Sequence, residues 1–244
     1  MGAAPGLLMG APKVISWKLK RELPHDPSAF TQGLEVFEGR YFLESTGQYG
    51  RSEIRKVEIS SGKIISQQAL DGKYFGEGLT RVGSDIFQLT WQEGVILKWS
   101  MSKGAKAFEQ KGTLPWIGEG WGITQGQGQL FISNGSSHLL VVDPKTLKVK
   151  RTLNVTLSGE GMDRLNELEF VDGKIFANVW MTSTIVRIDP KSGVIDGLMD
   201  INALVPKGIS IDAVPNGIAW DSKKKLLYVT GKLWPKVFEI SLLR

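Results

Sequence analysis

The sequence contains no cysteine and only two histidines among its 244 residues. A chain without cysteine cannot form disulfides, use a thiol nucleophile or bind zinc through thiolates. His25 and His138 are far apart, and neither has a second ligand at metal-binding spacing, so we expect no histidine metal site. No stretch reaches the roughly 18 apolar residues that a membrane-spanning helix needs. We therefore expect no bound metal, no other cofactor and no membrane partner.

Charge is not concentrated in any long run either. The net charge of +5 is spread along the chain, and its densest cluster is the three lysines at residues 223–225. This cluster falls on an expected hairpin turn, so we interpret it as a solvated turn and expect no nucleic-acid partner. The first thirteen residues lack the basic region and the apolar length of a signal peptide. We expect residues 1–13 to be a disordered, processed or engineered start and residues 14–244 to form a single domain.

The clearest feature of the sequence is a unit that occurs five times. Its first apolar strand starts with QGL, EGL, WGI, NEL and NGI, at Gln32, Glu77, Trp121, Asn166 and Asn216. Successive starts are 45, 44, 45 and 50 residues apart, a spacing typical of four-stranded propeller repeats of about 40 to 50 residues. A turn and two further apolar strands follow each time. The period therefore indicates an all-β propeller of five blades.

The two ends of the chain predict how the ring closes. Residues 14–23 alternate as a strand does but precede the first unit, whereas the last unit ends after its third strand. A propeller closes to remove exposed strand edges. We expect five blades of four antiparallel strands, with the N-terminal strand outermost in the last blade. The other outer strands are expected at residues 63–70, 105–114, 149–157 and 193–201.

Blade geometry turns this period into a candidate site. The first strand of a blade lines the central channel and the second runs back antiparallel, so first-strand starts and second-strand ends share one face. The residues predicted at this mouth are Gln32, Thr46, Glu77, Trp91, Trp121, Asn166, Trp180, Asn216 and Lys232, with Phe30 and Phe75 two residues before Gln32 and Glu77. The aromatic residues that recur in the second strands are predicted to pack between blades: Phe42, Phe87, Phe131, Phe176 and Tyr228.

Some of these residues also have plain structural interpretations. Glu77 lies between two glycines and fits a cap for backbone donors, or an ion pair with Lys232, as well as a catalytic role. Asn216 is interpreted more readily as a turn cap than as a site residue. Three other tryptophans are interpreted as packing between blades: Trp99, Trp116 and Trp220.

A series of motifs between Pro24 and Phe238 resembles a known family. The motifs are PHDPSAFTQGL, YGRSEIRKVE, GEGLT, LTWQEG, GEGWGIT, LNELEF with NVW, and NGIAWD with VTGKLWPK. In this order and spacing they are similar to plant-type glutaminyl cyclases, the five-bladed propeller glutaminyl-peptide cyclotransferases of plants and bacteria. One departure is Asn134, where the family pattern has an aspartate at the border of the mouth. We expect this difference to bear on substrate preference.

The resemblance implies an enzyme that cyclises an N-terminal glutaminyl residue to pyroglutamate and releases ammonia without a metal. The family's site residues fall on Phe30, Gln32, Phe75, Glu77, Trp91, Trp121, Asn166, Trp180 and Lys232. We expect Glu77 to shuttle the proton and the aromatic side chains to form a box around the glutaminyl residue. Lys232 is expected to stabilise the oxyanion, and the share that Asn166 takes in this stays open.

The implied partners are peptides or proteins with an N-terminal glutamine, and nothing suggests an obligate oligomer, so we expect a monomer. Related proteins are often exported, which implies a periplasmic or secreted location, although no intact signal peptide is present. Two alternatives stay open. Glu77, Asn166 and Asn216 offer oxygen ligands of the kind that calcium prefers, as in lactonase-like propeller hydrolases. The aromatic residues alone also fit a propeller that binds peptides or sugars without catalysis.

Overall fold

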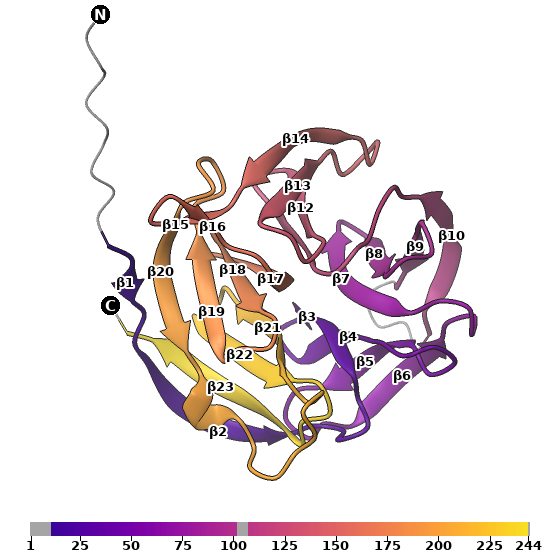
Figure 1. Ribbon diagram of the computed structural model, residues 1–244. Coiled ribbons are helices and arrows are strands. Elements are labelled where there is room, and N and C mark those ends of the chain that lie inside the picture. The colour runs from indigo at the N-terminus through magenta and orange to yellow at the C-terminus, as the bar shows by residue number, and fades with distance from the viewer. Residues whose placement is uncertain (1–10, 102–106, 244) are drawn as a thin grey trace, which may run out of the picture.

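The computed structural model describes residues 11–101 and 107–243. Five sheets of four antiparallel strands, one of them extended by a further strand, surround one axis, which confirms the predicted five-bladed propeller (Figure 1). Apart from the short 3-10 helix η1 (Asn202–Leu204), the elements of the described ranges are strands. These ranges contain no helix long and apolar enough to cross a membrane. Of the start expected to be disordered over residues 1–13, residues 1–10 lie outside the described residues, and Lys13 is part of a strand, β1 (Lys13–Val14).

Blades one to four run outward from the central channel in chain order, and blade five does so except for its outermost strand, β2 (Trp17–Pro24). Blade one comprises β3 (Thr31–Phe37), β4 (Tyr41–Thr46), β5 (Glu53–Glu58) and β6 (Ile64–Ala69). Blade two comprises β7 (Gly76–Val82), β8 (Asp85–Thr90), β9 (Val95–Ser100) and β10 (Glu109–Pro115). Blade three comprises β11 (Ile123–Gly126), β12 (Gln129–Ser133), β13 (His138–Val142) and β14 (Val149–Asn154). Blade four comprises β17 (Leu165–Val171), β18 (Lys174–Val179), β19 (Thr184–Ile188) and β20 (Ile195–Asp200), and blade five comprises β21 (Pro215–Asp221), β22 (Leu226–Gly231), β23 (Lys236–Leu242) and β2 (Trp17–Pro24).

The outer strands lie inside or close to their predicted ranges. The third ends earlier than expected, because the chain after Asn154 turns into a small hairpin of β15 (Thr156–Leu157) and β16 (Glu160–Gly161). Of the range predicted for the second outer strand, residues 105–106 lie outside the described residues.

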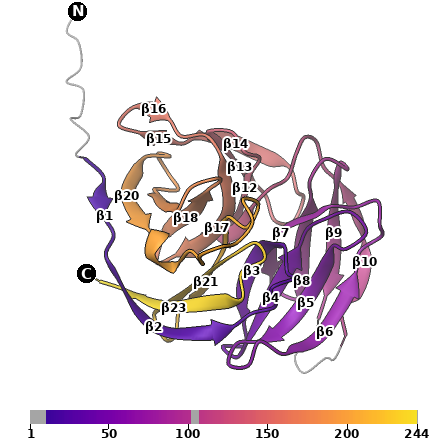
Figure 2. The same cartoon turned by 60° about the horizontal axis from the view of Figure 1, so that its bottom comes forward.

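The N-terminal segment closes the ring, but as two strands rather than the single strand expected over residues 14–23. Strand β2 pairs antiparallel with β23 and is outermost in blade five, as predicted. Strand β1 (Lys13–Val14) instead pairs parallel with β20 of blade four (Figures 1 and 2). The buried Ile15 packs on Gly197, where a Cβ would lie 2.7 Å from the Ile15 Cδ1 atom. The N-terminal segment therefore pairs with strands of both blade four and blade five.

His25 follows β2 and fastens the closing strand to blade one. Its Nδ1 lies 2.7 Å from the Trp234 carbonyl oxygen, and its Nε2 lies 2.8 Å from Glu44 Oε1. A carbonyl oxygen only accepts, so Nδ1 carries a hydrogen and the carboxylate draws a second proton to Nε2. Burial disfavours this charge, but the Glu44 carboxylate outweighs burial, and the pKa of His25 is raised. A buried charged pair thus spans the last and first blades.

Apolar side chains fill the five interfaces between neighbouring blades. The second-strand aromatics predicted to pack between blades are all buried in these clusters: Phe42, Phe87, Phe131, Phe176 and Tyr228. Burying one such side chain contributes roughly 1.5–3 kcal/mol. Trp99 and Trp116 are buried in the same clusters and Trp220 packs against one, which confirms their interpretation as packing residues.

The first strands are irregular where the site residues were predicted. Their pairing with the second strands shifts register between Thr31 and Gly33, Gly76 and Leu79, Leu165 and Leu168, and Pro215 and Ile218. Such β-bulges take a residue out of the ladder and redirect its side chain. The glycine after Glu77 has a separate reason, because a Cβ on Gly78 would lie 2.8 Å from the Gly122 Cα of the next blade. Neighbouring first strands therefore meet at van der Waals distance around the axis.

Candidate active site

A pocket of about 360 Å³ opens at the axial mouth that these bulges form. The nine residues carried over from the family resemblance all line it: Phe30, Gln32, Phe75, Glu77, Trp91, Trp121, Asn166, Trp180 and Lys232. They come from all five blades, so ring closure is what assembles the pocket. Thr46 and Asn216 were also predicted at the mouth but do not line the pocket. Thr46 accepts a hydrogen bond from the Glu53 backbone at its Oγ1 atom, 3.1 Å away.

Glu77 is a buried carboxylate with few hydrogen bonds to its neighbours. Its side chain accepts a hydrogen bond from Gln32 Nε2 at 3.0 Å, and the residue is only 5% exposed. Among the described residues no backbone N–H binds this carboxylate and no ion pair joins it to Lys232, so neither structural interpretation of Glu77 holds. Other carboxylates on the first strands do bind backbone N–H groups. Glu35, Glu167 and Glu169 accept those of Arg81, Ile218 and Trp220, each at 2.8 Å.

Asn216 fixes the direction of the hydrogen bond to Glu77. Its Nδ2 donates both to the Thr31 carbonyl and to Gln32 Oε1, each at 3.0 Å. Because a backbone carbonyl can only accept, the Asn216 amide has one allowed orientation, and Gln32 must then present its Nε2 to Glu77. The interpretation of Asn216 as a turn cap is wrong, since its amide bonds to blade one rather than to its own turn. Asn216 therefore lies outside the pocket and holds Gln32, which lines it.

Burial sets the electrostatics of the site. It raises the pKa of Glu77 well above its ordinary value, opposed by the positive charge of Lys232 and assisted by the negative charges of Glu93 and Glu119. Burial likewise lowers the pKa of Lys232, opposed by Glu77 and Asp212. Both groups are thus moved toward their neutral forms, and toward the pH range in which a side chain can exchange a proton. The Glu77 carboxyl therefore holds its proton at a higher pH than an ordinary carboxyl does.

Aromatic side chains form the wall of the pocket. Phe75 makes edge-to-face contacts with Phe30 and Trp91, with ring centroids 6.2 Å and 5.7 Å apart. Trp121 and Trp180 form a second edge-to-face pair at 5.8 Å. Such contacts fix ring orientations beyond the effect of burial alone.

The polar groups of the pocket stand against this wall. Lys232 Nζ lies 4.7 Å from the centre of the Phe30 ring, a distance at which a cation is attracted to the ring face. Asn166 is buried, and within the described ranges its Oδ1 atom has no hydrogen-bond partner. The pocket therefore combines rigid apolar faces with an ammonium group, a carboxylate and an unpaired amide oxygen.

Glycines allow the rings to lie where they do. A Cβ on Gly47 would lie 2.4 Å from the Phe75 ring, and one on Gly135 would lie 2.6 Å from the Trp121 ring. Gly135 also has a φ of +81°, which L side chains rarely adopt. The preceding Asn134 accepts hydrogen bonds from the backbone and hydroxyl of Ser136 at its Oδ1 atom. A carboxylate oxygen of aspartate can accept the same two bonds.

Sequence reasoning missed four residues of this site. Met181, Asp212 and Val214 also line the pocket. The last two belong to the longer interval of 50 residues before Asn216, which was the only sequence signal for extra residues near the mouth. Glu119 accepts hydrogen bonds from the indole N–H groups of two pocket tryptophans. Its signal was the GEG motif at residues 118–120, which repeats the GEG around Glu77.

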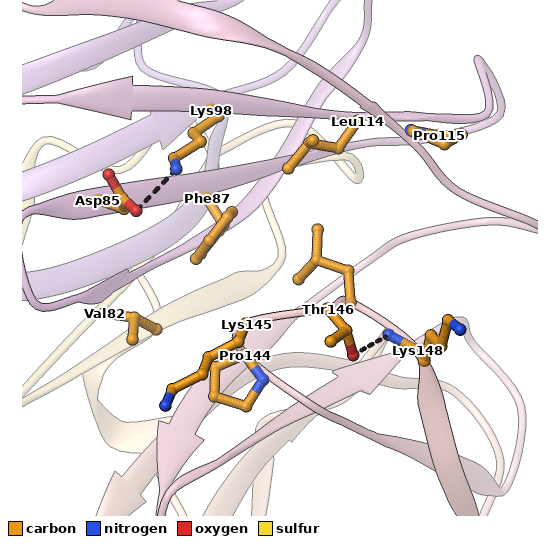
Figure 3. A pocket seen from close by; sticks show the side chains of 11 residues that line it. Val82, Asp85, Phe87, Lys98, Leu114, Pro115, Pro144, Lys145, Thr146 and Lys148 are labelled. Atoms are coloured by element: carbon orange, nitrogen blue, oxygen red, sulfur yellow. Dashed lines mark hydrogen bonds and ion pairs between the residues drawn. The ribbon is translucent and has the colours of Figure 1, made fainter.

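Another hollow, of about 620 Å³, lies away from the axis between blades two and three (Figure 3). It is lined by Val82, Phe87 and Leu114 and by the turn at residues 144–148. The Asp85 carboxylate beside it is paired with Lys98 at 2.8 Å. This hollow combines apolar side chains with charged ones on its rim, whereas the axial pocket contains a buried carboxylate and a buried lysine whose pKa values are shifted.

These features define the class of the protein, a five-bladed propeller whose aromatic axial pocket contains a buried carboxyl with a raised pKa. Comparison with known proteins narrows this class. The chain belongs to the glutamine cyclotransferase family, whose family model matches residues 3–242.

Two relatives support this membership. The chain is 40% identical over 225 residues to a glutaminyl-peptide cyclotransferase of Arabidopsis thaliana, covering 91% of this chain and 69% of that protein. The crystal structure of Myxococcus xanthus glutaminyl cyclase superposes with a TM-score of 0.87 at 33% identity, covering 96% of this chain and 100% of the other. A streptogramin B lyase structure, with a TM-score of 0.54 and 13% identity over 91% of this chain and 98% of that one, shares the fold alone.

Proposed function

We propose that this protein is a glutaminyl-peptide cyclotransferase, which converts the N-terminal glutaminyl residue of a peptide or protein to pyroglutamate and releases ammonia. The observation that carries the proposal is Glu77, a buried carboxylate inside the aromatic pocket of a glutamine cyclotransferase family member. None of the backbone N–H groups in residues 11–101 and 107–243 donates a hydrogen bond to it. Every residue invoked below comes from one ring, so a monomer suffices for the reaction.

The reaction needs a proton to move between two nitrogens of the same substrate residue. The neutral α-amine attacks its own side-chain amide carbon, forming a new C–N bond, and the bond from that carbon to the amide nitrogen then breaks. We assign Glu77 to take the proton from the attacking nitrogen and deliver it to the departing one, so that ammonia leaves as a neutral molecule. The carboxylate ends the cycle in the state in which it began.

The burial of Glu77 suits this role. A carboxylate with an ordinary pKa accepts a proton poorly near neutrality, whereas a raised pKa brings acceptance and release closer in energy. Gln32 donates to one carboxylate oxygen, which leaves the other for the substrate. Because the Gln32 orientation is fixed through Asn216, the carboxylate is held in place before the substrate binds.

Lys232 and Asn166 supply complementary groups to the amide under attack. We assign Lys232 to the developing negative charge on the amide oxygen, because an ammonium in a desolvated pocket stabilises an oxyanion strongly. The unpaired Oδ1 of Asn166 can accept a hydrogen bond from a substrate N–H group. A substrate lacking that N–H would leave a buried acceptor unsatisfied, at a cost of about 1–3 kcal/mol.

The aromatic wall holds the substrate folded back on itself. Attack within one residue requires the side-chain amide to curl toward the α-amine, and a tight pocket favours that conformer over extended ones. Faces of Phe30, Phe75, Trp91, Trp121 and Trp180 surround a space of about 360 Å³. We propose that this space admits the terminal glutaminyl residue while the remaining peptide extends from the mouth.

Incubation with a glutamine-initiated dipeptide tests the function directly. Enzyme-dependent release of ammonia together with a pyroglutamyl product supports the proposal, and absence of both overturns it. A matched asparagine-initiated dipeptide, one methylene shorter, serves as the negative substrate. The same assay separates the alternatives, because a calcium-dependent hydrolase would lose activity with a chelator and a binding protein would bind the dipeptide without releasing ammonia.

A further inference from the structure

The aromatic wall of the pocket is interrupted between two tryptophans, and Glu119 spans the interruption. Phe75 and Trp91 are in ring contact on one side, and Trp121 and Trp180 are in ring contact on the other. Within the described ranges, no ring contact joins Trp91 to Trp121. Glu119 Oε2 instead accepts hydrogen bonds from Trp91 Nε1 at 3.0 Å and from Trp121 Nε1 at 2.9 Å. A single carboxylate oxygen thus connects the two halves of the wall.

Glu119 is itself held firmly in this position. Its Oε1 atom accepts a hydrogen bond from Gln92 Nε2 at 2.8 Å, and the next residue, Gly120, donates its backbone N–H to the Trp91 carbonyl at 3.0 Å. Burial disfavours the charge of Glu119, but the hydrogen bonds from Trp121, Gln92 and Trp91 outweigh it and lower its pKa. The group is ionised at neutral pH, and hydrogen bonds to a carboxylate are stronger than those to a neutral acceptor.

The repeat places Glu119 at a position that other blades use for the wall. Phe30 precedes Gln32 by two residues, and Phe75 precedes Glu77 by two residues. Glu119 precedes Trp121 by the same interval. Blade three therefore has a carboxylate where blades one and two have a phenylalanine of the pocket wall. This carboxylate contacts the wall through its hydrogen bonds to the two indoles.

We propose that Glu119 is a positioning residue that holds Trp91 and Trp121 at the separation required by the glutaminyl side chain. The inference rests on the proposed cyclisation for its functional consequence, while its structural part concerns the indoles alone. An indole without this anchor can rotate about its side-chain bonds, and a displacement of about 1 Å can cost a hundredfold in rate. The pocket would widen and lose its hold on the folded-back substrate.

Two substitutions at residue 119 separate position from charge. Glu119→Ala removes the bridge, and we expect kcat/KM for a glutamine-initiated dipeptide to fall by about 10- to 100-fold, with KM raised. Glu119→Gln removes the charge, but its amide oxygen can still accept both indole N–H bonds. We expect this variant to stay within about threefold to fivefold of the unaltered protein, consistent with neutral hydrogen bonds replacing charge-assisted ones.

Glu109→Ala is the matched control, because it removes an exposed carboxylate on the outer strand β10, away from the pocket. We expect this variant to keep both its activity and its near-ultraviolet circular dichroism, which reports fixed tryptophan environments. Glu119→Ala should instead change that spectrum. If the alanine variant were as active as the unaltered protein, or the glutamine variant as impaired as the alanine one, the positioning role would be refuted.

A double-mutant cycle tests whether Glu119 acts through the indole N–H groups. Trp91→Phe keeps an aromatic ring but removes one of the two donors. The fold-decrease in kcat/KM of the double variant with Glu119→Ala should therefore be smaller than the product of the two single fold-decreases. Fully multiplicative effects would overturn the inference. Should Glu119→Ala fail to fold, Trp91→Phe and Trp121→Phe remove the same bonds singly and are expected to raise KM. Absence of ammonia release by the unaltered protein refutes the proposed function, whereas an unchanged dichroism spectrum in Glu119→Ala refutes the positioning.

Discussion

Replacement of Glu77 by glutamine separates proton transfer from pocket shape. Glutamine has nearly the same size, and its amide oxygen can still accept the hydrogen bond from Gln32. The other carboxylate oxygen, however, becomes an NH₂ group that cannot accept a proton from the substrate amine. We therefore expect turnover to collapse while substrate binding persists.

The expected size of the loss follows from the role assigned to Glu77. General acid–base catalysis contributes about 10²- to 10⁴-fold, equivalent to about 3–5.5 kcal/mol of transition-state stabilisation. Because the aromatic wall and the Gln32 bond remain, KM should change by less than about threefold. In the unaltered protein, kcat should fall as the pH falls through the raised pKa of Glu77, well above the ordinary carboxyl range. The residual activity of Glu77→Gln should not show this fall in kcat at low pH.

The assay is ammonia release from a saturating glutamine-initiated dipeptide, with the spontaneous cyclisation measured without enzyme and subtracted. Glu109→Gln is the control for loss of one acidic charge, since Glu109 lies on the outer strand β10 with 69% of its side chain exposed. This control should match the unaltered protein. Turnover within tenfold of normal for Glu77→Gln would refute the proton-shuttle assignment, and a large rise in KM with unchanged kcat would make Glu77 a binding residue.

Three further predictions concern the support of the site and the ring. Lys232→Ala should lower kcat by about 10²- to 10³-fold with a smaller effect on KM, as loss of an oxyanion donor does; a KM effect alone would contradict this. Asn216→Ala frees Gln32 to reverse its amide, so kcat should fall by about tenfold while KM changes little; a lowered melting temperature with unchanged kcat would make Asn216 purely structural. Because the pKa of His25 is raised, its stabilisation is fully present below about pH 6.5 and is lost as the pH rises through the raised value. The urea midpoint should fall over that range, and His25→Gln should lack this slope and cost about 3 kcal/mol at pH 6; a slope that persists in the variant would refute the assignment.

The fold was predictable because each repeat has a similar local sequence. Each blade needs a first strand, a turn and an apolar second strand, so similar letters recur at a nearly constant interval. The same register placed the nine pocket residues at the mouth, together with Thr46 and Asn216, which do not line the pocket. The family resemblance is what separated the nine from these two. The closing strand was predicted only in part. Its division into β1 and β2 depends on how Ile15 packs against Gly197 of another blade.

The hydrogen-bond partners of the site could not be predicted in this way. Nothing near Asn216 in the sequence indicates that its amide bonds to Gln32, because the two residues are 184 positions apart. Glu119 was hidden for a related reason: its link to Trp91 depends on the path of the segment between β10 and β11. Asp212 lies in the longest interval between units, where the repeat gives no register.

The sequence by itself determined that five similar units form a closed ring and which residues stand at its mouth, because periodicity fixes strand order and facing. Only the tertiary structure decided what those residues do to one another. Burial at the axis shifts the pKa values of Glu77 and Lys232, and the meeting of separate blades lets Glu119 join two indoles. Both effects arise from desolvation and contact across blade boundaries, which depend on distances that no local pattern encodes.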